Sequence, residues 1–215
     1  MNREQLKKAL RFYYITDDGV PDFPAAEQVR IAIQGGATLI QYRNKSFSPD
    51  CSQHLQEAVL IREICKNAGI PLIVNDNIEL ALQIMADGVH LGQADGSPAD
   101  ARKRMGKDAI VGASVSNLEE LARTDLASCD YMGTGPVFPT GTKANAKAVK
   151  GLAGFRKIAE IAPVPVVAIG GITAETAPSC FEHGASGIAV ISCISRAENP
   201  AENARKLGKI CQLRI

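Results

Sequence analysis

Short runs of hydrophobic residues alternate along the chain with longer segments whose apolar positions recur every three to four residues. The short runs have the composition of buried strands, and the longer segments have the spacing of amphipathic helices. Glycines follow the first two helical segments, where helices commonly end. The pattern predicts strands at residues 12–16, 38–43, 72–76, 88–92, 109–114, 131–135, 164–169 and 187–191. It predicts helices at residues 25–34, 51–67, 79–85, 99–105, 118–127, 152–161, 174–183 and 200–213.

These elements form eight strand–helix units at a fairly even pitch, with no linker or break in composition, so residues 1–215 are expected to form one domain. Strict alternation implies a parallel sheet, and the nearly continuous apolar strands imply that both faces are covered. Eight such units can close into a (β/α)₈ TIM barrel of the α/β class. The rival is an open doubly wound sheet. Its dinucleotide-binding form would carry G-x-G-x-x-G after the first strand, and residues 15–19 do not.

Composition narrows the choice of partners. Hydrophobic residues make up 46% of the chain, charged residues 22%, and the net charge is +1, so no overall field favours nucleic acid or a membrane surface. No apolar run reaches the ~20 residues that span a bilayer, and residues 1–11 do not resemble a signal peptide. The 6 cysteines form no C-x-x-C pair, which favours free thiols in a reducing compartment. We therefore expect a cytoplasmic protein with no nucleic-acid or membrane partner, while a homo-oligomer stays open.

Basic residues gather where strands are expected to end, which is where TIM barrels place their active sites. Gln41, Arg43 and Lys45 end the second strand at a spacing of two, so an extended chain presents them on one face. The loop after the sixth strand adds Lys143. The alternative is that Arg43 and Lys45 are a solvated pair in a loop. Together the three cations favour an anionic substrate.

Two acidic residues follow consecutive strands, which are neighbours in a barrel. Asp76 ends the third strand and Asp95 follows the fourth. Two carboxylates suit Mg²⁺, which takes a few oxygen ligands, keeps waters and completes its shell with substrate phosphate. Either aspartate could instead cap the next helix. A glycosidase pair is a further use of two carboxylates, but neutral sugars do not match a cationic mouth.

A glycine pair marks a candidate phosphate site. Gly170 and Gly171 end the seventh strand and lead into the helix expected at 174–183, so their backbone could cradle an anion at a helix start. Ile191 and Ser192 end the eighth strand, and the loops after strands seven and eight form the common phosphate site of TIM barrels. A plain tight turn is the alternative. His90, inside the fourth strand, is expected to be a core histidine or one that supports the site.

In this order along nearly the whole chain, the motifs resemble the thiamine-phosphate synthase family. They are Gln41-Tyr42-Arg43-Asn44-Lys45, Asn75-Asp76-Asn77, His90-Leu91-Gly92-Gln93-Ala94-Asp95, Gly135-Pro136-Val137-Phe138-Pro139-Thr140-Gly141-Thr142-Lys143 and Ile169-Gly170-Gly171-Ile172. The chain departs from the family at Asn77, which is often acidic there, at Gly96, where methionine is common, and in residues 144–150, which are less rich in proline. None of these departures removes an expected ligand.

The resemblance implies a transferase that condenses hydroxymethylpyrimidine diphosphate with hydroxyethylthiazole phosphate and releases pyrophosphate. It implies that Gln41 binds the aminopyrimidine, that Arg43, Lys45, Asn75 and Lys143 hold the pyrophosphate, and that Asp76 and Asp95 bind Mg²⁺. It places Ser114 near the pyrimidine or its leaving group, Thr140 and Thr142 on the thiazole side, and Gly171, Ile191 and Ser192 around the thiazole phosphate. Arg43, Lys45, Ser114 and Lys143 are the residues expected to take part in catalysis.

Three other functions stay open at this point. A thiazole tautomerase of the same barrel family would keep the phosphate cradle without a pyrophosphate and metal set. A non-catalytic sensor of phosphorylated ligands would keep the cradle alone. A barrel isomerase would need a general acid and base at the strand ends, and no convincing pair stands there. The retained acids and cations favour the synthase.

Overall fold

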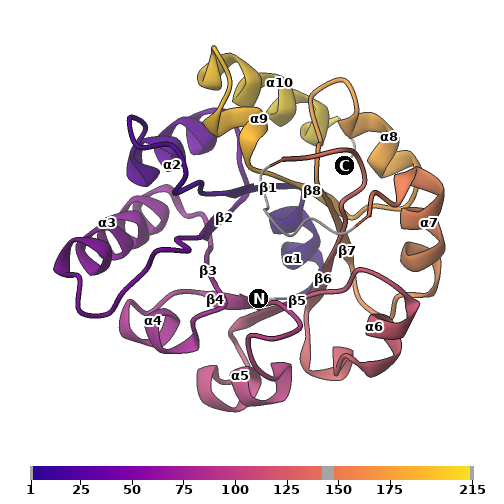
Figure 1. The fold of residues 1–215 in the computed structure, drawn as a ribbon, viewed down its shortest axis with the longest axis horizontal. Coiled ribbons are helices and arrows are strands. Elements are labelled where there is room, and N and C mark those ends of the chain that lie inside the picture. The colour runs from indigo at the N-terminus through magenta and orange to yellow at the C-terminus, as the bar shows by residue number, and fades with distance from the viewer. Residues whose placement is uncertain (1, 142–147, 214–215) are drawn as a thin grey trace.

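In the computed structural model, which describes residues 2–141 and 148–213, the strands close into a parallel barrel in chain order (Figure 1). The strands are β1 (Phe12–Ile15), β2 (Leu39–Tyr42), β3 (Leu72–Asn75), β4 (Gly88–Leu91), β5 (Ile110–Ser114), β6 (Tyr131–Thr134), β7 (Val166–Ile169) and β8 (Gly187–Val190). β1 pairs with β8 and so closes the ring. The predicted TIM barrel is therefore confirmed, and the open sheet is excluded.

The helices that follow the strands form an outer ring around the barrel (Figure 1). They are α2 (Ala25–Gln34), α3 (Ser52–Ala68), α4 (Ile78–Gln83), α5 (Pro98–Met105), α6 (Leu118–Arg123), α7 (Gly151–Ile161), α8 (Ala177–Glu182) and α10 (Pro200–Gln212), with a short turn α9 (Ser192–Ser195) directly after β8. Within the described residues, no helix is both long enough and apolar enough to cross a membrane.

Two of the predicted helices are shorter than expected. α6 ends at Arg123 because Thr124 has extended backbone angles and its hydroxyl donates to the Glu120 carbonyl 2.7 Å away; a short 3₁₀ turn, η1 (Leu126–Ser128), follows. α8 begins at Ala177, not at 174, because the Thr176 hydroxyl accepts from the Thr173 N–H and shapes a separate turn before the helix.

A helix that the pattern did not predict closes the amino-terminal end of the barrel. α1 (Arg3–Leu10) begins with a capping box, in which the Asn2 side chain accepts from the Gln5 N–H and the Gln5 side chain accepts from Asn2. Its Leu6 and Leu10 are buried against the barrel interior. The hydrophobic pattern did not predict this helix because its charged residues outnumber the leucines that pack against the barrel.

Side chains that alternate along the strands divide the core into two parts. The barrel interior is filled by Tyr13, Ile15, Leu39, Ile73, Ile110, Tyr131, Val167, Ala189 and Ile191. The layer between strands and helices includes Phe12, Tyr14, Ile40, Tyr42, Leu72 and Val74 from the same strands. The bottom of the barrel is therefore solid, and open space is left at the carboxyl ends of the strands.

Candidate active site

Two adjoining cavities occupy the carboxyl-terminal mouth of the barrel. One, of about 410 Å³, is lined by residues from all eight strands and from the segments that follow β2, β3 and β4, including Gln41, Arg43 and Asp76. The other, of about 340 Å³, lies towards β6, β7 and β8 and includes Gly171 and Ser192. Residues common to both walls are Gly92, Asp95, Ser114, Gly133, Ile169 and Ala189. The mouth can therefore hold two small molecules side by side.

The basic end of the site is built by the chain just after β2. Thr16, following β1, fixes Arg43 twice, because its hydroxyl accepts from the Arg43 N–H at 2.8 Å and donates to the Arg43 carbonyl at 3.0 Å. Asp18 pairs with the Arg43 guanidinium at 3.5 Å and accepts from the Lys45 N–H at 2.7 Å. Arg43 is buried, whereas Lys45 reaches out and contacts Asp76 with its ammonium 2.5 Å from Oδ2. Thr16 and Asp18 thus position both cations.

Asp76 and Asp95 lie together at the wall of the larger cavity, and each affects the pKa of the other. Burial acts to raise the pKa of Asp76, but the hydrogen bond and charge of Lys45 outweigh it, so the pKa of Asp76 is lowered. Burial and the Asp76 charge raise the pKa of Asp95. Gly92 makes this approach feasible, because a Cβ there would lie 2.3 Å from Asp95 Oδ2. The pair is one electrostatic unit that would accept a further cation.

Neither aspartate caps the following helix. The side chain that caps α4 is Asn77, which accepts from the Leu80 N–H at 2.9 Å, and the residue preceding α5 is Ser97. Asp76 instead has a left-handed backbone, with φ at 63°, and its N–H donates to the His90 carbonyl on the neighbouring strand at 2.8 Å. The capping alternative is therefore excluded, and both carboxylates face the site. Asn75 adds an amide that donates to Asp76 at 2.5 Å.

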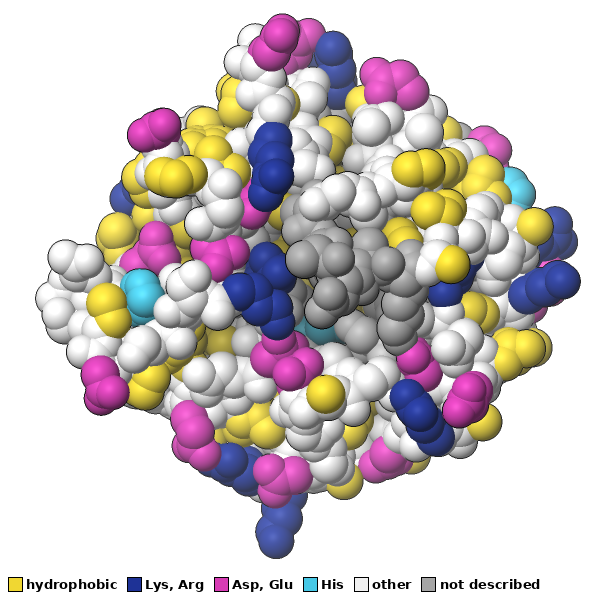
Figure 2. All heavy atoms as spheres, in the orientation of Figure 1, with side chains coloured by type: hydrophobic (Ala, Val, Ile, Leu, Met, Phe, Trp, Pro, Cys, Tyr) yellow, Lys and Arg dark blue, Asp and Glu magenta, His cyan; other side chains and the backbone are white. Residues whose placement is uncertain are grey.

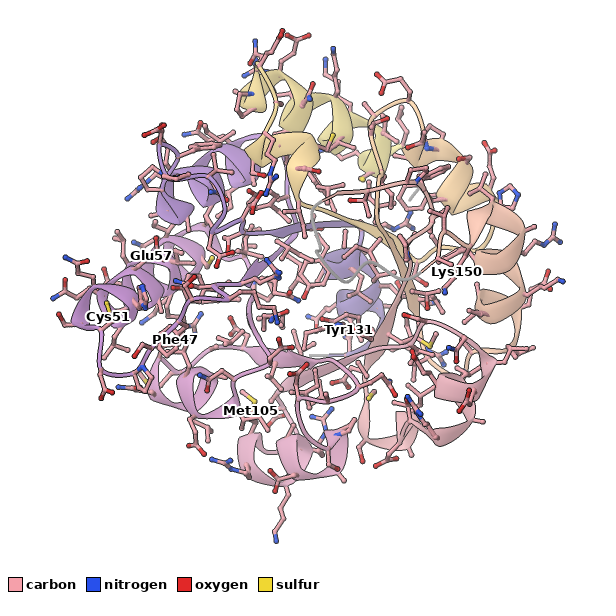
Figure 3. The ribbon with its side chains drawn as sticks, viewed as in Figure 1. Phe47, Cys51, Glu57, Met105, Tyr131 and Lys150 are labelled. Carbon is pink, nitrogen blue, oxygen red and sulfur yellow. The ribbon has the colours of Figure 1, made fainter. Side chains whose placement is uncertain are left out.

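The floor of the larger cavity is polar. Gln41 donates to the Tyr13 hydroxyl at 2.6 Å, and that hydroxyl lies 2.8 Å from the Tyr131 hydroxyl. His90 contacts Tyr131 through Nδ1 at 3.0 Å and Ser114 through Nε2 at 2.9 Å. Tyr131 lies at the centre of the barrel (Figure 3). His90 supports the site as expected, but the two tyrosines were missed because they read as core residues.

The phosphate side needs one correction. Gly170 and Gly171 have positive φ angles of 100° and 63° and line the smaller cavity with Ile191 and Ser192. They do not lead into a helix, since α8 begins only at Ala177. Glycine is required at 171 also because a Cβ would lie 2.3 Å from the Pro139 carbonyl oxygen. The helix that adjoins this cavity is the short α9.

A buried carboxylate joins the first and last units of the barrel. Asp17, following β1, accepts from the Ser195 hydroxyl at 2.9 Å and from Arg196 Nε at 2.8 Å. Asp17 is 3% exposed. Its pKa is lowered: burial opposes ionisation, but hydrogen bonds from Arg196, Ser195 and the Gly19 N–H outweigh it. This contact holds α9 against β1. Nothing in the sequence around Asp17 indicates this contact, because its partners lie about 180 residues further along the chain.

The loop after β6 is described only in part. Thr140 lines the smaller cavity. Thr142 and Lys143 lie outside the described residues. Viewed from this mouth, Figure 2 shows Lys and Arg side chains beside Asp and Glu side chains near the centre of the face. The structure thus brings Gln41, Arg43, Lys45, Asn75, Asp76, Asp95 and Ser114 around one cavity, and Ser114, Thr140, Gly171, Ile191 and Ser192 around the next.

Fold and site together define a TIM-barrel enzyme that handles small molecules at an acidic and basic mouth. Residues 12–194 match the thiamine monophosphate synthase family. The chain is 42% identical over 211 residues to thiamine-phosphate synthase of Bacillus velezensis, covering 97% of this chain and 94% of the relative. It is 44% identical over 199 residues to the enzyme of that name from Methanocella arvoryzae, covering 92% and 93%.

The solved structure of thiamine phosphate pyrophosphorylase from Pyrococcus furiosus superposes with a TM-score of 0.86 at 37% identity, covering 98% of this chain and 99% of that one. The chain therefore belongs to the thiamine monophosphate synthase family. It is a transferase of thiamine biosynthesis, and its function is thiamine-phosphate synthesis.

Proposed function

We propose that the enzyme joins hydroxymethylpyrimidine diphosphate to hydroxyethylthiazole phosphate and releases pyrophosphate by a dissociative displacement. The observation that carries this proposal is the meeting of two acids and two cations, from the ends of β2, β3 and β4, around one cavity that adjoins a second, glycine-lined cavity. One cavity would hold the diphosphate and the other the thiazole phosphate. Two substrates held in contact lose little further translational and rotational entropy when they react, which lowers the barrier.

The residues present fit Mg²⁺. Asp76 and Asp95 offer carboxylate oxygens close together at the wall of one cavity, and each affects the pKa of the other. A site with only two protein ligands suits Mg²⁺, because this ion retains waters and also binds substrate phosphate. We propose that these two residues hold Mg²⁺. The bound ion would offset charge on the departing pyrophosphate.

The cations would hold the leaving group. Arg43 and Lys45 reach the same cavity as the two acids, and we assign the same role to Asn75 and Lys143. In the ligand-free protein Lys45 neutralises Asp76. Lys45 would turn from Asp76 to the diphosphate when that anion enters the cavity. Fixed cations at the position where negative charge develops lower the barrier because they need no reorganisation during the reaction.

The remaining residues would orient the two reacting rings. Gln41 binds the aminopyrimidine on the floor, and Ser114 lies at the boundary of the two cavities, near the bond that breaks. Thr140 and Thr142 line the thiazole side, and Gly171, Ile191 and Ser192 cradle its phosphate. A neutral aromatic nitrogen attacks without losing a proton, so no general base is required. We also propose a cytoplasmic location, which the free cysteines support.

A pyrophosphate-release assay tests this proposal. With both substrates and Mg²⁺, the full-length enzyme is expected to release one pyrophosphate for each thiamine phosphate formed. Omission of the thiazole phosphate or chelation of the metal should abolish product formation. A thiazole tautomerase would release no pyrophosphate under any of these conditions, so that outcome would replace the synthase proposal with the tautomerase.

A further inference from the structure

Five polar side chains from five strands form a continuous chain of hydrogen bonds across the barrel. It runs from Gln41 on β2 through Tyr13, Tyr131 and His90 to Ser114 on β5. Each consecutive pair is joined by a contact of 2.6–3.0 Å. We call these residues the floor relay. The first four side chains are buried, whereas Ser114 is only partly buried, at the wall of both cavities.

With the Gln41 amide oriented so that its N–H₂ group faces Tyr13, the direction of the other hydrogen bonds follows from counting protons. The Gln41 amide N–H donates to the Tyr13 hydroxyl, so the single Tyr13 proton is available to Tyr131. Tyr131 accepts that proton and donates its own to His90 Nδ1. If His90 donated from Nδ1, Tyr131 would donate to Tyr13, and the Tyr13 proton would have no acceptor in the described floor. A buried donor without an acceptor costs about 1–3 kcal/mol, so this arrangement is disfavoured.

The same counting fixes the direction of the hydrogen bond at the other end of the floor relay. With Nδ1 accepting, the neutral His90 ring carries its proton on Nε2 and donates to Ser114 Oγ. The Ser114 proton is then free to point into the cavities. Burial raises the pKa of both tyrosines, first through desolvation, so both hydroxyls keep their protons near neutral pH.

The charges around the cavity favour this polarity over its reverse. Gln41 shares the larger cavity with Arg43 and Lys45, which attract the negative oxygen of its amide. Ser114 shares both cavities with Asp95, which attracts a hydroxyl proton. The reverse relay would present the amide N–H₂ towards the cations and the hydroxyl lone pairs towards the carboxylate.

We infer that the floor relay is directional, so that Gln41 offers substrates a carbonyl oxygen and Ser114 offers a hydroxyl proton. This inference rests on the proposed function and deepens it. A carbonyl oxygen selects a ring with an exocyclic amine, which donates, over the corresponding oxo ring, which cannot. A hydroxyl donor at Ser114 stabilises negative charge on the leaving group. Tyr13, Tyr131 and His90 are then positioning residues that determine specificity through Gln41 and Ser114.

The tautomer of His90 tests the relay without any turnover. ¹⁵N-histidine spectra of the ligand-free full chain at neutral pH, assigned by comparison with His90→Gln, are expected to show a protonated Nε2 and an unprotonated Nδ1. A proton on Nδ1, alone or together with Nε2, would overturn the relay. Because no substrate is present, this result stands even if the proposed reaction proves wrong.

Substrate discrimination tests the consequence. Tyr13→Phe removes the group that holds the amide, so kcat/KM for the aminopyrimidine diphosphate relative to its oxo analogue should fall about tenfold or more. Tyr42→Phe is the matched control, because its hydroxyl donates to Glu57 of α3, outside the barrel interior (Figure 3). The control should keep the ratio. An unchanged ratio in a folded Tyr13→Phe enzyme would contradict the specificity role.

Discussion

At the scale of single residues, the site depends on charges that are held close together before any ligand arrives. Lys45 neutralises Asp76, and Gly92 provides the space in which Asp95 approaches the same carboxylate. Charges of opposite sign kept within about 4 Å stabilise each other more strongly when water is partly excluded. An incoming diphosphate and cation would therefore bind to charged side chains that are already in position.

The carboxylate charge of Asp76 can be removed without disturbing the backbone. Asparagine tolerates the left-handed conformation, with φ at 63°, better than other non-glycine residues do. Asp76→Asn should therefore fold with a melting temperature close to that of the parent, while kcat falls by about 10²-fold or more because the metal site loses one charge. Steady-state rates at saturating Mg²⁺, with thermal melts beside them, measure both effects. A normal rate would refute the metal role of Asp76.

The space at Gly92 can be tested by filling it. In Gly92→Ala the new Cβ would lie 2.3 Å from Asp95 Oδ2, so the carboxylate must turn away. Only the end of a side chain has to move, so stability should change little while the Mg²⁺ concentration needed for half-maximal rate rises about tenfold or more. Gly154→Ala, on the interior of α7, is the control and should keep that concentration. Equal behaviour of the two variants would argue against the close approach.

At the scale of elements, the strands and most helices follow from local periodicity, but the contacts between elements do not. The ends of α6 and α8 depend on single hydroxyls, Thr124 and Thr176, that bond to nearby backbone. The role of Asp17 depends on residues almost at the other end of the chain. Such pairs become neighbours only when the barrel closes, and one sequence without its fold gives no register between β1 and β8.

The contact of Asp17 with α9, which holds α9 against β1, should make the free energy of unfolding depend on pH. The folded pKa of Asp17 lies below the unfolded value of about 3.9, so its ionised form stabilises the protein above that value and the gain is lost as pH falls through the folded pKa. Asp17→Asn should therefore cost about 1–3 kcal/mol of unfolding free energy at pH ~7, and the difference from the parent should shrink below pH ~4. Urea titrations across this range measure it. A difference independent of pH would show that packing alone, not ionisation, is lost.

At the scale of the whole molecule, the barrel separates stability from chemistry. The amino-terminal end is packed by α1 and the interior side chains, whereas the carboxyl-terminal end carries the two cavities. The sequence predicted the ring of acids, cations and glycines, since strand ends are recognisable. It did not predict the floor relay, because tyrosines inside a barrel look the same in sequence whether they only pack or also donate.

This separation predicts opposite outcomes for changes at the two ends. Leu10 is fully buried beneath the barrel, so Leu10→Ala should lower the free energy of unfolding by about 2–5 kcal/mol through lost contacts and a residual cavity. The mouth lies at the other end of the strands, so KM and kcat should match the parent well below the melting temperature. Asp76→Asn should give the reverse pattern, with stability kept and turnover lost. If Leu10→Ala changed KM while still fully folded, the amino-terminal plug would be coupled to the site, and the two ends of the barrel could not be treated as independent.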